Sequence, residues 1–90
     1  MTTSRAQRRK DRELQIVAVF GKDRAPVALD LLELVELAWH DCYSEVTPSK
    51  ELIDDMLLLS DGSIETFVQV ARLAVADWRD LKVAVEKRRG

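Results

Sequence analysis

Ninety residues with 47% hydrophobic and 33% charged content predict one globular domain, long enough for a single small core. No run approaches the roughly 18 apolar residues that a membrane span needs, and the basic start MTTSRAQRRKDR is not followed by a signal-peptide core. The lone Cys42 cannot form a disulfide within the chain, which agrees with a reducing compartment. We therefore expect a cytoplasmic protein that does not associate with membranes.

The charges are unevenly distributed along the chain, although the net charge is only −2. Residues 1–12 carry +4 and residues 82–90 carry +3, and subtracting both from the total leaves −9 on residues 13–81. The sequence thus predicts an acidic body, a basic N-terminal arm over residues 1–12 and a basic C-terminal end over residues 82–90.

Hydrophobic periodicity predicts an all-α domain of four helical segments, arranged as an antiparallel bundle. The first segment covers about residues 4–20 and ends at Gly21, which suits the left-handed conformation that follows a helix. Its second half, LQIVAVF, is rich in β-branched residues and also suits a strand, and its basic first half is also compatible with a mobile arm. No partner strand is evident elsewhere in the sequence, which favours a helix.

The next two segments have clear start and stop signals. The second begins at Pro26, because proline is tolerated in the first turn of a helix, and it ends before Thr47. The third begins at Thr47–Pro48, where threonine can cap the helix, and it ends at Asp61–Gly62.

A fourth helix is predicted over about residues 64–88, with Ser63 as its N-cap. Its apolar residues are spaced three and four apart, as in a helix that packs along a partner at a shallow angle: Ile64, Phe67, Ala71, Ala74, Trp78, Leu81 and Val85. Two interpretations stay open, a seam within one chain and a seam between two copies. In both, Trp78 fills a gap in the packing, and the stripe is not a cofactor site, so we expect no cofactor.

The pentapeptide WHDCY at residues 39–43 gathers the only histidine, cysteine and tyrosine of the chain. On a helix, residues 40 and 42 point roughly 200° apart, so His40 and Cys42 cannot form a nucleophile–base pair. We expect Cys42 to be buried on the apolar face. Trp39 and Tyr43 should pack against the core with their polar atoms at its edge.

Two groups of carboxylates could also form sites. Glu36 lies one turn before His40 on the polar face, so we expect a surface imidazole held by a carboxylate, with a metal site completed across a dimer as a distant alternative. Asp54 and Asp55 are adjacent, but neighbours on a helix point about 100° apart. We therefore expect both on a solvated face and not paired for acid–base catalysis, and the sequence predicts no catalytic residue.

Four leucines fall outside the apolar arcs of their helices: Leu34, Leu37, Leu58 and Leu73. Several exposed leucines on one surface mark an interface. We therefore expect a non-enzymatic protein–protein interaction module that binds itself or another protein, with the second and fourth helices contributing.

The basic ends support an alternative function, accessory binding of nucleic acid. In an up-down-up-down bundle both termini emerge at one end, where their charges would form one positive pole that contacts phosphate. The residues concerned are Arg5, Arg8, Arg9, Lys10, Arg12, Lys87, Arg88 and Arg89. No aromatic residue stands among them to stack on bases, so nucleic-acid binding is not the favoured function.

Three strings, AWHDCY, TPSKELIDDMLLL and ARLAVADWRDLKVAV, resemble those in small hypothetical proteins of actinobacteria. The similarity covers about residues 26–85 and leaves the basic ends outside it. The resemblance implies an all-helical fold and a bacterial cytoplasmic setting, and it implies no activity, ligand or catalytic residue.

Overall fold

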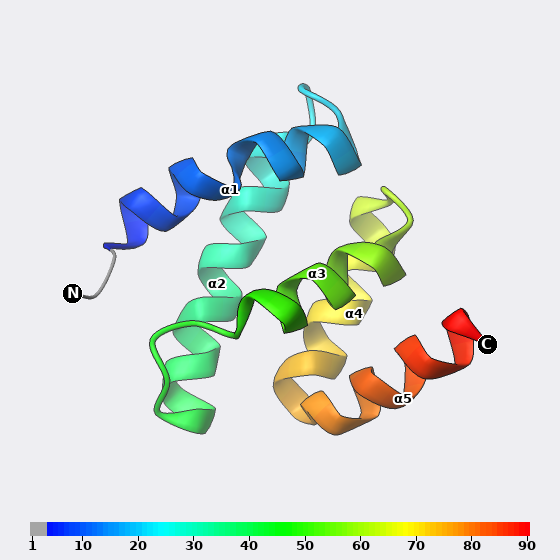
Figure 1. Cartoon of the computed structure of the whole chain (residues 1–90). Helices are drawn as coiled ribbons and strands as arrows, with labels where there is room; N and C mark the ends of the chain where they lie inside the picture. The colour runs from blue at the N-terminus through cyan, green and yellow to red at the C-terminus, as the bar shows by residue number, and fades with distance from the viewer. Residues whose placement is uncertain (1–3) are drawn as a thin grey trace.

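The computed structural model describes residues 4–90, and over this range the chain forms five α-helices and no strand (Figure 1). The helices are α1 (Arg5–Phe20), α2 (Ala25–Tyr43), α3 (Lys50–Ser60), α4 (Ile64–Ala76) and α5 (Trp78–Arg89). The all-α prediction is therefore confirmed. The strand alternative for LQIVAVF is wrong, because α1 continues through this stretch to Phe20.

Serine side chains begin three of the helices. Ser4, Ser49 and Ser63 each accept a hydrogen bond from a backbone N–H in the first turn of α1, α3 and α4, which satisfies a donor that the helix itself leaves unpaired. The predicted start of the third segment at Thr47 is too early, because Ser49 is the cap that the helix uses.

The predicted fourth helix is two helices, because the chain bends at Asp77. This residue has an extended backbone, φ −161° and ψ 101°, and its side chain accepts a hydrogen bond from the backbone N–H of Arg79 at 3.0 Å. Asp77 thus caps α5, and the negative charge of Asp80 in the first turn interacts favourably with the positive end of the helix dipole. The bend also overturns the expected role of Trp78, whose side chain is 40% exposed and fills no gap in the core.

The core joins all five helices through fully or nearly fully buried side chains. Phe20 and Phe67 meet at a centroid distance of 5.1 Å, which brings the end of α1 against the start of α4. The largest side chains with almost no exposed surface come from every helix: Ile16, Leu32, Met56, Phe67 and Leu81. Most of the predicted apolar stripe of residues 64–85 does face this core, although it is divided between two helices.

The helices are not arranged as an antiparallel bundle. Figure 1 shows α2 and α4 running in the same direction; α1 crosses α2, and α3 and α5 pack on α4. Near the ends of this parallel pair, the Tyr43 hydroxyl donates a hydrogen bond to the Val75 carbonyl at 2.9 Å. The start of α1 and the end of α5 lie on opposite sides of the molecule.

Candidate functional site

The pentapeptide WHDCY lies in the last turns of α2, as predicted, and its aromatic residues belong to the packing. Trp39 is buried and its Nε1 donates to Glu45 Oε1 at 3.2 Å, while the Tyr43 ring lies 4.4 Å from the Trp39 ring, centroid to centroid. Both residues therefore place their apolar parts in the core and their polar atoms at its edge, which confirms the prediction for them.

The prediction that Cys42 is buried is wrong, because its side chain is exposed. The helical period correctly turns Cys42 towards the same side as Val35, which is buried, but α2 ends at Tyr43 and little of the protein covers its last turn. His40 is also exposed, and its ring nitrogen lies 3.9 Å from Asp41. WHDCY therefore holds no reactive pair.

Glu36 is the centre of a buried ion-pair cluster and does not hold His40. Its side chain is only 2% exposed, and its Oε2 lies 2.6 Å from Arg8 Nε and 3.4 Å from Arg12 Nη1. Arg12 also donates to Thr47 Oγ1 at 2.9 Å, which ties the α2–α3 connection to the same cluster. The prediction that Glu36 faces solvent beside His40 is wrong, because α1 packs over this face of α2 and supplies the arginines.

The pKa of the Glu36 carboxyl reflects this environment. Burial raises the pKa, but hydrogen bonds to Arg8 and Thr47 and the charge of Arg12 outweigh burial, so the pKa lies below its ordinary value. Glu36 is therefore charged at neutral pH and neutralised by the arginines, and it is not poised as a general acid or base.

The residues around His40 do not suit a metal ion. His40, Glu36 and Asp41 border one hollow, but Arg5 and Arg8 line the same hollow, and their charges repel a cation. Among residues 4–90, no three metal-ligating side chains cluster together. The arrangement therefore lends no support to the metal alternative.

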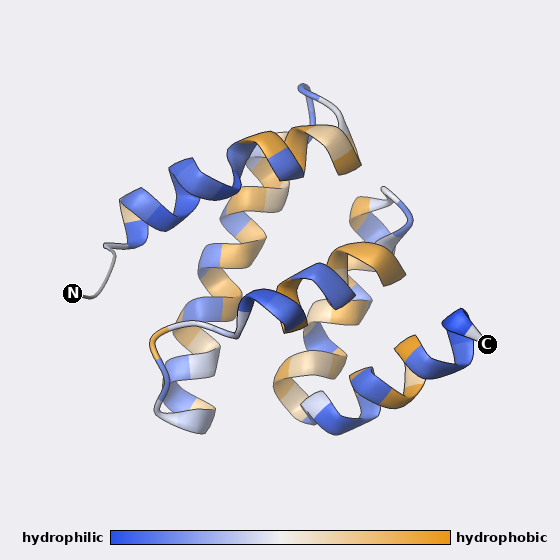
Figure 2. Ribbon diagram, in the orientation of Figure 1, coloured by the Kyte–Doolittle hydropathy of each residue, from blue (hydrophilic) through white to orange (hydrophobic). Residues whose placement is uncertain are grey.

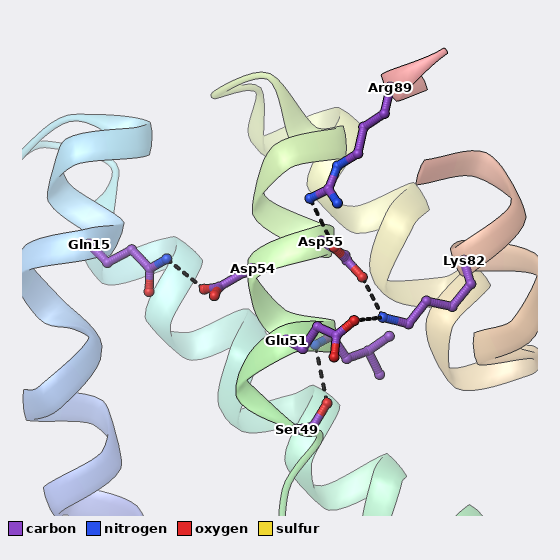
Figure 3. Close-up of polar contacts among 8 residues, drawn as sticks. Gln15, Ser49, Glu51, Asp54, Asp55, Lys82 and Arg89 are labelled. Atoms are coloured by element: carbon purple, nitrogen blue, oxygen red, sulfur yellow. Dashed lines mark hydrogen bonds and ion pairs between the residues drawn. The ribbon is translucent and has the colours of Figure 1, made fainter. Parts of the chain in front are cut away.

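Asp55 forms a second buried cluster, shown in Figure 3, between α3 and α5. Its carboxylate lies 2.7 Å from Lys82 Nζ and 3.6 Å from an Arg89 guanidinium nitrogen, and Lys82 also reaches Glu51 at 3.0 Å. Hydrogen bonds to Asp55 and then Glu51 raise the pKa of Lys82. The neighbouring Asp54 points the other way and accepts a hydrogen bond from Gln15 at 2.8 Å.

The prediction that Asp54 and Asp55 share a solvated face is therefore wrong for Asp55, which is buried. The two adjacent side chains point in different directions, as expected for a helix. Asp55 therefore points into the α3–α5 interface, whereas Asp54 points towards α1.

The two clusters have the same arrangement: a basic terminal helix, α1 or α5, packs on an acidic helix, α2 or α3, around a buried carboxylate. Figure 2 shows that α1 is hydrophilic in its first half and hydrophobic in its second half, and the buried residues of α1 are Ile16 and Phe20. Helix α5 likewise buries only Leu81 and Val85. Ion pairs therefore hold the parts of these helices that have little apolar surface to bury.

The two basic ends do not form the single positive pole that the sequence predicted. The basic ends of α1 and α5 lie on opposite sides of the molecule, so their charges do not combine (Figure 1). Most of the arginines proposed for nucleic acid also contact carboxylates: Arg8 and Arg12 with Glu36, Arg9 with Asp30 and Glu33, Arg88 with Asp61, and Arg89 with Asp55. Within the described part of the chain, only Arg5, Lys10 and Lys87 of that set make no ion pair.

The four predicted interaction leucines do not form one surface. Leu34, Leu37 and Leu58 are exposed, but Leu58 lies on α3, and Leu37 borders the hollow beside His40. The expectation for Leu73 is wrong, because its side chain is half-buried against the core. Leu34 alone of the four lines the apolar groove described next.

An apolar groove of about 380 Å³ lies between α2 and α4. It is shallow and open, and its lining is aliphatic apart from one arginine: Leu31, Leu34, Val35, Ala38, Val68, Ala71, Arg72, Val75 and Ala76. The sequence predicted that the second and fourth helices contribute to an interface, but it did not single out Val68 and Val75, although their seven-residue interval signals a second apolar stripe on α4.

Comparison with protein-family models, with curated proteins and with solved structures finds no match to this chain. Across the described residues, the helices are too short or too polar to cross a membrane. The function is therefore argued from the geometry of the chain itself.

Proposed function

We propose that this chain is a non-enzymatic protein–protein interaction module, and that the groove between α2 and α4 is its binding face. The observation that carries the proposal is the position of Leu34, which is 61% exposed and lines an aliphatic groove. A single exposed leucine needs no explanation, whereas an exposed leucine inside an apolar groove marks a surface that gains from being covered.

The gain from covering this surface is substantial for so small a protein. Burying a fully exposed leucine or valine side chain contributes about 1.5–3 kcal/mol, and a partner would cover the exposed parts of Leu34 and Val68, which are 61% and 38% exposed, together with the smaller Ala38 and Ala76. Small residues between large ones let a partner's backbone come close. The lining suits the apolar face of another protein chain and not a polar metabolite, because Arg72 is its one charged residue.

The non-enzymatic part of the proposal is supported by the state of the buried carboxylates. Glu36 is saturated by Arg8 and Arg12, and Asp55 by Lys82 and Arg89, so each is committed to holding a helix in place. A cytoplasmic setting is proposed with this function, supported by a chain that contains a single cysteine.

Site-specific photo-crosslinking tests the proposal. A photoreactive amino acid replaces Leu34 in the full chain, and in a matched variant it replaces Leu14, which is 86% exposed on α1 and away from the groove. We expect position 34, and not position 14, to give an adduct of discrete mass that mass spectrometry identifies as protein. The adduct should disappear when Val68→Glu places a charge in the groove. Equal labelling from both positions, or an adduct that survives Val68→Glu, contradicts the proposal.

A further inference from the structure

Two exposed charges of opposite sign lie near the groove, Arg72 in its α4 lining and Asp41 on the side of α2 that faces away from α4. Arg72 lies on the α4 edge and makes no ion pair within residues 4–90. Asp41 lies on α2 and is 86% exposed; His40 lies 3.9 Å away, and Arg5 borders the same hollow. Each of these charges is therefore available to a partner.

The helical period places Asp41 on the edge of α2 that faces away from α4. Leu31 and Ala38 turn towards α4 and line the groove, whereas Asp41 borders the hollow on the α1 side together with Arg5. Asp30 lies on the same edge as Asp41, but Arg9 of α1 already binds it at 2.7 Å. Seen from outside, the order across the surface is Asp41, the apolar groove, and then Arg72.

This order makes the surface complementary to itself in one orientation. If two copies meet face to face about a two-fold axis perpendicular to the helices, α2 lies over α2 and the two acidic edges meet. If the axis runs parallel to α2 and α4, each α2 lies over the partner's α4, and the acidic edge of each copy meets the partner's Arg72. Opposite charges favour the second arrangement, and like charges disfavour the first.

The heights of these residues along the helices also match. The hydrogen bond from the Tyr43 hydroxyl to the Val75 carbonyl joins the last turn of α2 to the last turn of α4. Asp41 is two residues before Tyr43 and Arg72 three before Val75, about 3 and 4.5 Å along the axis. Leu34 is nine residues before Tyr43 and Val68 is seven before Val75, so their distances along the helix axes from these two residues differ by only about 3 Å. A two-fold axis along the groove keeps these heights unchanged, so Leu34 faces the partner's Val68 region while Asp41 faces the partner's Arg72.

We infer that the occupant of the α2–α4 groove is a second copy of this chain, in a two-fold dimer whose axis runs along the groove and which pairs Asp41 of each copy with Arg72 of the other. This inference rests on the proposed function and names its partner. The aliphatic centre supplies the attraction, and the two symmetry-related ion pairs select the orientation.

Charge reversal tests the orientation, with analytical ultracentrifugation as the measurement. Arg72→Glu and Asp41→Arg each place like charges together at both symmetry-related positions. Each variant alone should therefore have a dimer dissociation constant at least about tenfold higher than that of the unaltered chain. An equimolar mixture of the two variants should restore association, because every pair in the mixed dimer then joins opposite charges. The double variant Asp41→Arg, Arg72→Glu should restore it as well.

Glu86→Arg is the matched control, because it makes the same change of charge on an exposed position of α5. It should leave association unchanged. Circular dichroism should show the same helix content in all variants, because the altered side chains are exposed. The inference is overturned by a monomeric parent chain at about 100 µM, or by a mixture that associates no better than either variant alone.

These failures are distinguishable from failure of the proposed function. If the parent chain is monomeric and position 34 still crosslinks in the groove to a protein of another mass, the interaction function stands and the second copy is excluded as its partner. If position 34 gives no adduct and the chain is monomeric, both fall.

Discussion

Arg8 Nε lies 2.6 Å from Oε2 of Glu36, which joins the first turn of α1 to the middle of α2 across 28 positions of sequence. The carboxylate is almost completely buried, and both arginines that bind it are largely covered. A buried charge is costly when it loses its partner. This contact therefore makes the position of α1 depend on one side chain of α2.

Removing this carboxylate should strongly destabilise the fold. We expect Glu36→Ala to lower the free energy of unfolding by about 3 kcal/mol, because Arg8 and Arg12 are then left partly buried without a counter-charge. Urea unfolding followed by circular dichroism measures the change. Glu33→Ala is the control, since Glu33 also contacts an arginine, Arg9 at 3.2 Å, but both side chains are about one third exposed. It should cost about 0.5 kcal/mol, and equal costs for the two variants would contradict the role given to burial.

The same carboxylate should contribute to the pH dependence of stability. The pKa of Glu36 is lower in the folded chain than its ordinary value of 4.5, so the folded state binds the proton less readily than the unfolded state. Its stabilisation is therefore complete above about pH 5 and is lost as the pH falls through the folded pKa.

Glu36→Gln removes this titration while keeping a similar shape. We expect the variant to be less stable at neutral pH, with a smaller loss of stability between about pH 5 and about pH 3 than the parent chain shows. Urea unfolding at a series of pH values measures it. Glu13→Gln, at an exposed position of α1, should keep the parent profile. A Glu36→Gln profile parallel to that of the parent would argue against the assignment.

Gly62 should be far less tolerant of substitution than Gly21, although both have positive φ angles, +77° and +88°. A Cβ at position 62 would lie 2.8 Å from the backbone oxygen of Val19 in α1, whereas a Cβ at position 21 would meet nothing within 4 Å. Both alanine variants carry backbone strain of about 1–3 kcal/mol, since each position has a positive φ angle. Only Gly62→Ala must also displace α1 from the α3–α4 turn.

Thermal unfolding compares the two glycine variants directly. We expect Gly62→Ala to reduce the free energy of unfolding by at least about 1 kcal/mol more than Gly21→Ala does. A similar loss in both would mean that backbone strain alone decides the outcome and that the approach of Val19 adds nothing.

Most of the helical structure was predictable, because local signals decide it. Serine caps, the glycine after α1 and the three-and-four spacing of apolar residues act within a few positions of one another. The missed break at Asp77 had a local signal too, since Asp77 followed by Asp80 is a pattern typical of a helix start. The apolar spacing continued through the bend and favoured one long helix over two.

The sequence by itself determined the helices, the divergence of His40 and Cys42, and the segregation of charge between the ends and the body. Only the tertiary structure decided which polar positions are covered. The helical period gives the direction of a side chain, but whether another helix covers it depends on contacts between residues 27 or 28 positions apart, as for Glu36 and Arg8 or Asp55 and Lys82. For the same reason the groove, formed where α2 and α4 run side by side, emerges only when the chain folds.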